Sequence, residues 1–276
     1  MPLPVHNAIR YVQPLREGGS LPAIVDTDGG LFVVKFRGAG QGPKALIAEL
    51  IVGLLAQRLG FPVPEPALIE IAPAFGRAEP DPEIQEILRD SHGINAGARY
   101  LDGAFNFDPY AAGEYITPEF AAELVWFDGY TTNPDRTHRN PNILIWQRKP
   151  WLIDHGAAIY VHHSWETADS ERTRAPFPLI KDHVLLSEAD DIAAADRRLA
   201  ARLSPQLVDA VLAAVPDGLL RDPLIADEFP NAEAARGRYR EFLLQRLGEP
   251  REFVAEAIEA RQRRLSAPVL RRQARR

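Results

Sequence analysis

DRTHRNPNILI at residues 135–145 is a turn-rich segment that leads into an apolar strand, and LIDHG follows at residues 152–156. An aspartate held in such a turn could accept a proton from a hydroxyl, and an asparagine a few residues later could bind a metal ion through its amide oxygen. Asp154 ends the second strand of a hairpin that we expect over residues 142–154, with its turn at RKP. Oxygen ligands at loop mouths suit magnesium, which prefers one or two carboxylates together with substrate phosphates. Each segment alone is also compatible with an ordinary turn.

A lysine and a glutamate upstream strengthen the functional interpretation. Lys35 lies in the apolar strand LFVVKF at residues 31–36. Glu49 lies in the helix that we expect over residues 42–60, where its neighbours at helical spacing are apolar or small. A carboxylate on such a face is costly unless it is paired. Lys35 is the natural partner.

The order of these features is more specific than any one of them. A glycine turn at Gly18 and Gly19 precedes Lys35 and Glu49, and the two aspartate segments follow. Protein-kinase-like enzymes have the same order of glycine-rich loop, strand lysine, helix glutamate, Asp-x4-Asn and Asp-x-Gly.

The sequence most resembles the HipA-like branch of the protein-kinase-like superfamily. The resemblance extends from about residue 16 to residue 185 and is carried by AELIVGLLAQRLGFPVPEP, NPDRTHRNPNILIW, WLIDHGAAI and FPLIKDHVLL. DRTHRNPNILI is also similar to the corresponding segment of phosphatidylinositol kinases.

The resemblance implies a role for each matching residue. Lys35 would hold the nucleotide phosphates and Glu49 would orient this lysine. Asp135 would be the catalytic base, and Asp154 would bind magnesium. ATP and Mg²⁺ are therefore the expected cofactors.

The resemblance also leaves three parts of the site open. Asn140 has the expected spacing from Asp135, whereas Asn142 directly precedes the apolar strand, so either asparagine could be the second metal ligand. The adenine would lie near Tyr100 and Leu101. The turn REGGS at residues 16–20 falls short of a full G-x-G-x-x-G motif, which leaves open how the phosphates are covered.

Elements of different type occupy the two parts of the chain. Turn signals and strands dominate the first part, and the chain is mostly helical from residue 187 onward. This segregation predicts an α+β protein rather than an alternating parallel sheet. We expect a small β-rich N-terminal lobe at residues 1–104 and a larger helical lobe at residues 105–276. The polar segment 162–182 is expected to be a surface loop.

Composition narrows the partners and the compartment. The net charge of −6 argues against nucleic acid as a partner. The exception is the basic tail at residues 261–276, which has seven arginines and no acid and could bind phosphate groups. No apolar run is long enough to span a membrane, and no signal peptide is recognisable. The chain has no cysteine. We therefore expect a cytoplasmic protein.

The predicted function is ATP-dependent transfer of phosphate to a hydroxyl. A protein serine or threonine is the first expectation for the acceptor, and a lipid or small molecule is the alternative. A catalytically silent nucleotide-binding or interaction protein is the alternative from another class. Retention of Lys35, Glu49, Asp135 and Asp154 argues against silence, because a silent domain has no chemical reason to keep all four.

Overall fold

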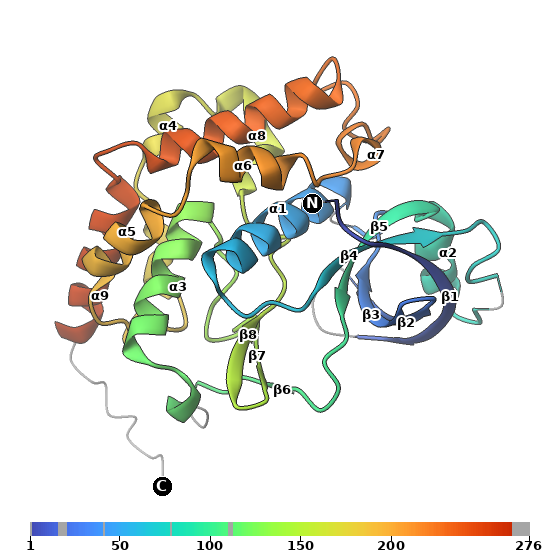
Figure 1. Cartoon of the computed structure of the whole chain (residues 1–276), viewed down its shortest axis with the longest axis horizontal. Coiled ribbons are helices and arrows are strands. Elements are labelled where there is room, and N and C mark those ends of the chain that lie inside the picture. The colour runs from blue at the N-terminus through green and yellow to red at the C-terminus, as the bar shows by residue number, and fades with distance from the viewer. Residues whose placement is uncertain (1, 16–20, 41, 78, 110–112, 267–276) are drawn as a thin grey trace, which may run out of the picture.

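The structure is a computed structural model that describes residues 2–15, 21–40, 42–77, 79–109 and 113–266. Within these ranges a β-rich N-terminal region is followed by a mostly helical C-terminal part, as Figure 1 shows. The predicted mixed α+β character is thus confirmed. Gly18 and Gly19 of the expected phosphate-covering turn lie outside the described residues.

Five strands of the N-terminal region close into a barrel with the order β1-β2-β3-β5-β4. Neighbouring strands are antiparallel except β1 and β4, which close the barrel in parallel. The strands are β1 (Val5–Pro14), β2 (Ala23–Thr27), β3 (Gly30–Lys35), β4 (Pro66–Ile71) and β5 (Gly93–Arg99). Side chains alternate along β3, so Phe32 and Val34 are buried in the barrel core, and Lys35 points to the other face. This alternation directs the lysine toward the helical part.

Two helices accompany the barrel. Helix α2 (Pro82–Asp90) is amphipathic, and its apolar face packs on the barrel core through Leu88. Helix α1 (Gly42–Leu59) is buried over most of its length and belongs to the same large core as the C-terminal helices. In Figure 1 it lies between the barrel and those helices. Glu49 is therefore carried on an element that both parts of the molecule contact.

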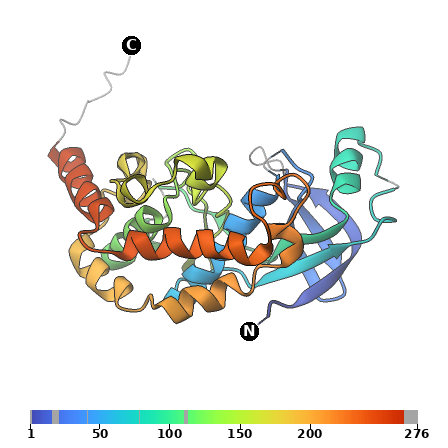
Figure 2. The same ribbon diagram turned by 90° about the horizontal axis from the view of Figure 1, so that it is seen from above.

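The C-terminal part combines a small sheet with helices. Its sheet has the order β6-β7-β8. Thr117 caps the N-terminus of α3 by accepting a hydrogen bond from the backbone N–H of Phe120. The elements are β6 (Phe105–Asn106), η1 (Gly113–Tyr115), α3 (Pro118–Thr131), β7 (Ile143–Trp146), β8 (Lys149–Leu152), η2 (Tyr160–Thr167), α4 (Ser170–Arg174), η3 (Pro178–Asp182), α5 (Ile192–Ala200), α6 (Pro205–Leu212), α7 (Asp217–Leu220), α8 (Ala232–Leu247) and α9 (Glu252–Ser266). Figure 2 shows α8 extending along the helical part, with its N-terminal end on the side of the barrel.

Two local predictions need correction. The turn of the β7–β8 hairpin is formed by Gln147 and Arg148, both with positive φ, rather than by RKP, because Lys149 already pairs with Trp146. The segment 162–182 is not an irregular loop. It folds into short helices that bury Phe177 and Ile180 in the large core, whereas Leu179 and many polar residues of the segment stay exposed.

None of the helices in the described part of the chain combines the length and the apolar character that a membrane crossing requires.

Candidate active site

A cavity of about 380 Å³ lies between the barrel and the β7–β8 hairpin. Backbone and apolar side chains from the barrel form one wall, and the ends of the hairpin strands form the other. Tyr100 and Leu101, which follow the last barrel strand, line this cavity where the sequence placed an adenine. It is also lined by Lys35, Glu49, Asn140, Asn142 and Asp154. The structure therefore brings most of the predicted site residues to one cleft.

Lys35 joins two carboxylates at the bottom of this cleft. Its Nζ lies 2.6 Å from Oε2 of Glu49 and 2.5 Å from Oδ1 of Asp154. The same Glu49 oxygen accepts a hydrogen bond of 2.7 Å from the backbone N–H of His155. The pairing of Lys35 with Glu49 is the contact that the sequence predicted. The structure adds that Glu49 also fixes the backbone directly after Asp154.

The charges in this group stabilise one another. Burial alone would lower the pKa of Lys35, but the neighbouring Glu49 and Asp154 carboxylates outweigh it and raise this pKa. Burial would raise the pKa of Asp154, but Lys35 lowers it below its ordinary value. Lys35 is thus a cation and Asp154 an anion over the whole physiological pH range. This is the charge state required to bind phosphates and a divalent cation.

Asp154 is followed by two residues that fit closely under α1. A Cβ atom on Gly156 would lie 3.4 Å from the carbonyl oxygen of Ala45 and 3.6 Å from Nζ of Lys35, so this loop lies directly against the helix and the lysine. His155 is buried beside Gly53 of α1, and burial lowers the pKa of its imidazole to about 4. The His155 ring is therefore neutral at physiological pH and packs as a core side chain.

Asp135 is held by the two asparagines between which the sequence could not choose. Asn140 and Asn142 donate from their Nδ2 atoms to Oδ2 of Asp135, over 2.7 Å and 3.1 Å. Burial and the negative charge of Asp154 raise the pKa of Asp135, although both hydrogen bonds act in the opposite direction. Asp135 is half-buried and is a carboxylate with increased basicity.

A buried ion pair fixes the loop that carries Asp135. Nε of Arg136 donates to Oδ2 of Asp128 over 2.6 Å, and both side chains are fully buried. Nη1 of the same guanidinium donates to the backbone carbonyl of Asn142 over 2.5 Å. Arg136 directly follows Asp135, and its side chain links the end of the loop at Asn142 to helix α3. Paired buried charges of this kind hold one geometry, because any rearrangement would leave a charge unpaired.

His183 completes the support from a distant segment. Its Nδ1 accepts a hydrogen bond from the backbone N–H of Leu185, so the neutral ring carries its proton on Nε2 and donates it to Oδ2 of Asp128 over 3.0 Å. Burial would raise the pKa of Asp128, but Arg136 and His183 lower it to about 2. Sequence reasoning missed these three residues. The available signal was Asp128, an acid within the apolar second half of the helix.

The donor set fits a magnesium ion that is bound together with phosphates. The described residues contain no group of three or more histidines or acids that would hold a metal ion by themselves. They do place the Asp154 carboxylate and two asparagine amides along one cleft. Magnesium commonly takes one or two protein oxygens and completes its shell with water and phosphate oxygens. Asp154 with Asn140 or Asn142 would serve such an ion.

Comparison with known proteins places the chain in a family. The sequence model of the HipA-like kinase family matches residues 9–174. The chain belongs to this family. The match includes the strand of Lys35, the helix of Glu49 and both aspartate segments, so the predicted resemblance is confirmed over most of its extent. No protein with a curated description matches the HipA-like chain.

A solved structure has the same overall fold. The crystal structure of a Helicobacter pylori proinflammatory kinase, CtkA, superposes with a TM-score of 0.60 and covers 94% of this chain and 99% of its own. The two sequences are only 13% identical, so this similarity concerns the fold. It extends the correspondence beyond residue 174 into the C-terminal helices.

Proposed function

We propose that this HipA-like protein is an ATP-dependent phosphotransferase that uses magnesium and transfers the γ-phosphate to a hydroxyl. The observation that carries the proposal is the joining of Lys35 to both Glu49 and Asp154 at 2.6 Å and 2.5 Å, at the base of the cleft. A nucleotide-binding kinase needs a fixed cation for its phosphates and an oxygen ligand for its metal at one place. The family membership of the chain supports the same reaction.

The two-lobed architecture is part of the proposal. The barrel would be the small lobe, the helical part would be the large lobe, and ATP would lie in the cavity between them. Its adenine would contact the segment at Tyr100 and Leu101, which lines this cavity. Lys35 would bind the phosphates, and Glu49 would hold the lysine in position. A bound magnesium ion would supply neutralisation of the phosphate charge.

Asp135 is the proposed base for the acceptor hydroxyl. Both asparagine bonds end on Oδ2, so Oδ1 is the oxygen left for the acceptor among the described residues. Its raised pKa makes it a better proton acceptor than an ordinary aspartate. A protein serine or threonine is the proposed acceptor. A lipid or small-molecule hydroxyl would require the same chemistry.

Thermal unfolding with nucleotide tests the binding half of the proposal. A ligand that binds only the folded state stabilises it, so ATP with magnesium should raise the melting temperature. Asp154→Asn should remove the magnesium-dependent part of this shift. Asp90→Asn, which changes an exposed aspartate on α2, is the matched control and should keep it. Absence of any shift in the unaltered protein at millimolar ATP would contradict the proposal.

A further inference from the structure

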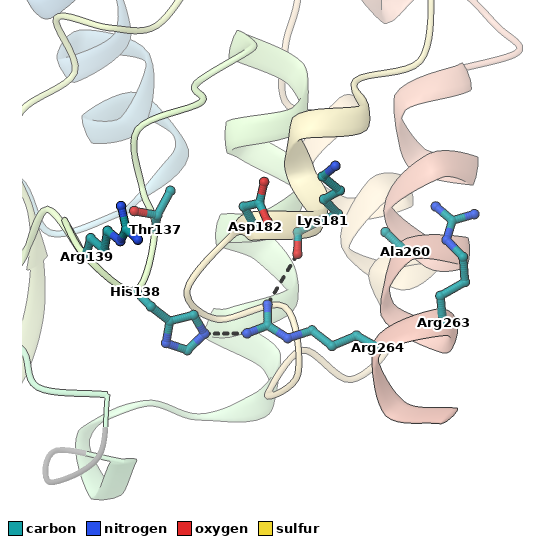
Figure 3. Close-up of a pocket in the computed structure, with 8 residues that line it drawn as sticks. All are labelled: Thr137, His138, Arg139, Lys181, Asp182, Ala260, Arg263 and Arg264. Atoms are coloured by element: carbon teal, nitrogen blue, oxygen red, sulfur yellow. Dashed lines mark hydrogen bonds between the residues drawn. The ribbon is translucent and has the colours of Figure 1, made fainter. Parts of the chain in front are cut away.

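A second cavity lies beside the loop that carries Asp135. It is an open pocket of about 860 Å³. One wall is Thr137, His138 and Arg139, a second is the end of η3, and a third is the last turns of α9 (Figure 3). We call it the basic pocket, and its lining residues are Thr137, His138, Arg139, Lys181, Asp182, Ala260, Arg263 and Arg264. None of these residues lines the first cavity, which is proposed to hold ATP and is called the nucleotide cleft below.

Positive charge dominates this pocket. Arg139 and Lys181 are exposed, and neither has an ion-pair partner among the residues that the structure describes. Asp182 is the one acid in the lining. Arg263 is different, because it pairs with Glu256 and Glu259 of its own helix.

Arg264 gives the pocket a fixed cation. Its guanidinium donates to the backbone carbonyl of His183 over 3.0 Å and to the ring Nε2 of His138. Figure 3 shows His138 and Arg264 pointing toward each other from opposite walls. Because these acceptors are uncharged, the positive charge of Arg264 stays uncompensated. The contact also joins α9 to the loop of Asp135, so the shape of the pocket is tied to the proposed reaction centre.

The loop of Asp135 separates the two cavities. Asn140 and Asn142 line the nucleotide cleft, and Arg139, the neighbour of Asn140, lines the basic pocket. A group bound in the pocket would therefore lie across this loop from the nucleotide. An acceptor must present its hydroxyl to Asp135 from outside the cleft, so part of the acceptor would extend along this wall.

We propose that the basic pocket binds an anionic side chain of a protein acceptor, a carboxylate or a phosphate close to the hydroxyl that receives phosphate. This assignment rests on the proposed function for the identity of the ligand as an acceptor. Arg139 and Lys181 supply the cations that would bind this group. Arg264 keeps the walls of the pocket together through its bonds to His138 and to the carbonyl of His183. Complementary charge of this kind selects among partners and speeds their association.

Binding of designed peptides tests the proposal directly. The probes are a fluorescein-labelled serine peptide with glutamates on both sides of the serine, its glutamine counterpart, and a third peptide with phosphoserines in place of the glutamates. Fluorescence anisotropy measures their affinity for the full chain at low salt, where exposed charge pairs are least screened. The glutamate or the phosphoserine peptide should bind more tightly than the glutamine peptide. The stronger of the two anionic peptides identifies the source of the charge.

A double variant assigns this preference to the pocket. One exposed charge pair contributes up to about fivefold in affinity. The double variant Arg139→Gln with Lys181→Gln should therefore lower the affinity for the anionic peptide by roughly threefold to twentyfold. The glutamine peptide should be unaffected. Arg58→Gln with Arg77→Gln changes the net charge equally at exposed positions outside both cavities and should leave the preference unchanged.

The outcomes separate this inference from the proposed function. Equal affinity for all three peptides, or a preference that survives in the pocket double variant, overturns the inference. The ATP-induced thermal shift is measured on the same samples, and its absence overturns the proposed function independently of peptide binding. The pocket variant should retain that shift, because neither substituted residue lines the cleft.

Discussion

Nζ of Lys35 lies 2.5 Å from Oδ1 of Asp154, although 119 positions separate the two residues in the sequence. The contact joins the last barrel strand before α1 to the end of the β7–β8 hairpin. Nζ of Lys35 also lies 2.6 Å from Oε2 of Glu49. The base of the cleft is thus a single charged group to which three distant segments contribute.

Replacement of Lys35 should destabilise the fold as well as the site. Lys35→Met leaves the partly buried carboxylates of Glu49 and Asp154 without a cation. The free energy of unfolding should fall by about 1–3 kcal/mol, less than for a fully buried pair because these side chains keep some exposure. Urea unfolding measures this change. Lys149→Met, at an exposed hairpin position, is the control, and equal stability of the two variants would refute the coupling.

The buried pair of Asp128 and Arg136 should contribute more to the free energy of unfolding than the Lys35 group does. Asp128→Asn leaves the guanidinium of Arg136 buried without its carboxylate. The free energy of unfolding should drop by about 3–5 kcal/mol at neutral pH. Asp90→Asn provides the exposed comparison and should change stability little.

The contribution of Asp128 should depend on pH with a definite sign. The folded-state pKa of Asp128 is lowered to about 2 from an ordinary value of 3.8. Its stabilisation is therefore complete above pH 3.8 and is lost as the pH falls through the folded-state pKa. The difference between Asp128→Asn and the unaltered protein should shrink over this acid range. A constant difference would show that the Asp128 charge is not the cause.

The rate of phosphate transfer should decline at acid pH because Asp135 must be deprotonated to act as a base. Burial and Asp154 raise the pKa of Asp135, so the decline should begin at a higher pH than an ordinary aspartate would give. Asn140→Ala removes a hydrogen bond that lowers this pKa, and the decline should move to still higher pH. A pH–rate profile measures the shift. An unchanged profile in Asn140→Ala would contradict the role of Asp135.

The magnesium dependence of the rate should distinguish the two asparagines. Loss of a metal ligand raises the magnesium concentration needed for half-maximal rate, whereas loss of a hydrogen bond to Asp135 does not. Asn140→Ala and Asn142→Ala are compared by titration with magnesium at fixed ATP. We expect one of them to require more magnesium. If neither does, the second ligand is not an asparagine of this loop.

Much of the site followed from local sequence rules. Glu49 interrupts an apolar helix face, and such an acid needs a partner, which predicted its contact with Lys35. The same rule applies to Asp128 on α3, but its second partner, His183, lies 55 positions away, just after the segment 162–182 that was expected to be a polar loop. The sequence has no local pattern that pairs such distant residues. The roles of the site residues and the boundary between residues 104 and 105 stay predictions.

The basic pocket was also beyond the reach of sequence patterns. Arg139, Lys181 and Arg264 belong to three segments that only the packing of α9 against η3 and the Asp135 loop brings together. The sequence suggested only a nucleic-acid contact for the basic tail at residues 261–276. Arg264 instead bonds to His138 and the carbonyl of His183, and residues 267–276 lie outside the described residues.

Phosphate transfer by an Asp135→Asn variant tests the central claim most directly. Nucleotide binding should persist, because the substitution leaves the Lys35, Glu49 and Asp154 group intact. Transfer of labelled γ-phosphate from ATP to casein or to the protein itself should fall by about 10²- to 10⁴-fold, the usual contribution of a general base. We expect this loss together with an unchanged ATP-induced thermal shift. Transfer by Asp135→Asn at the rate of the unaltered protein would contradict this claim.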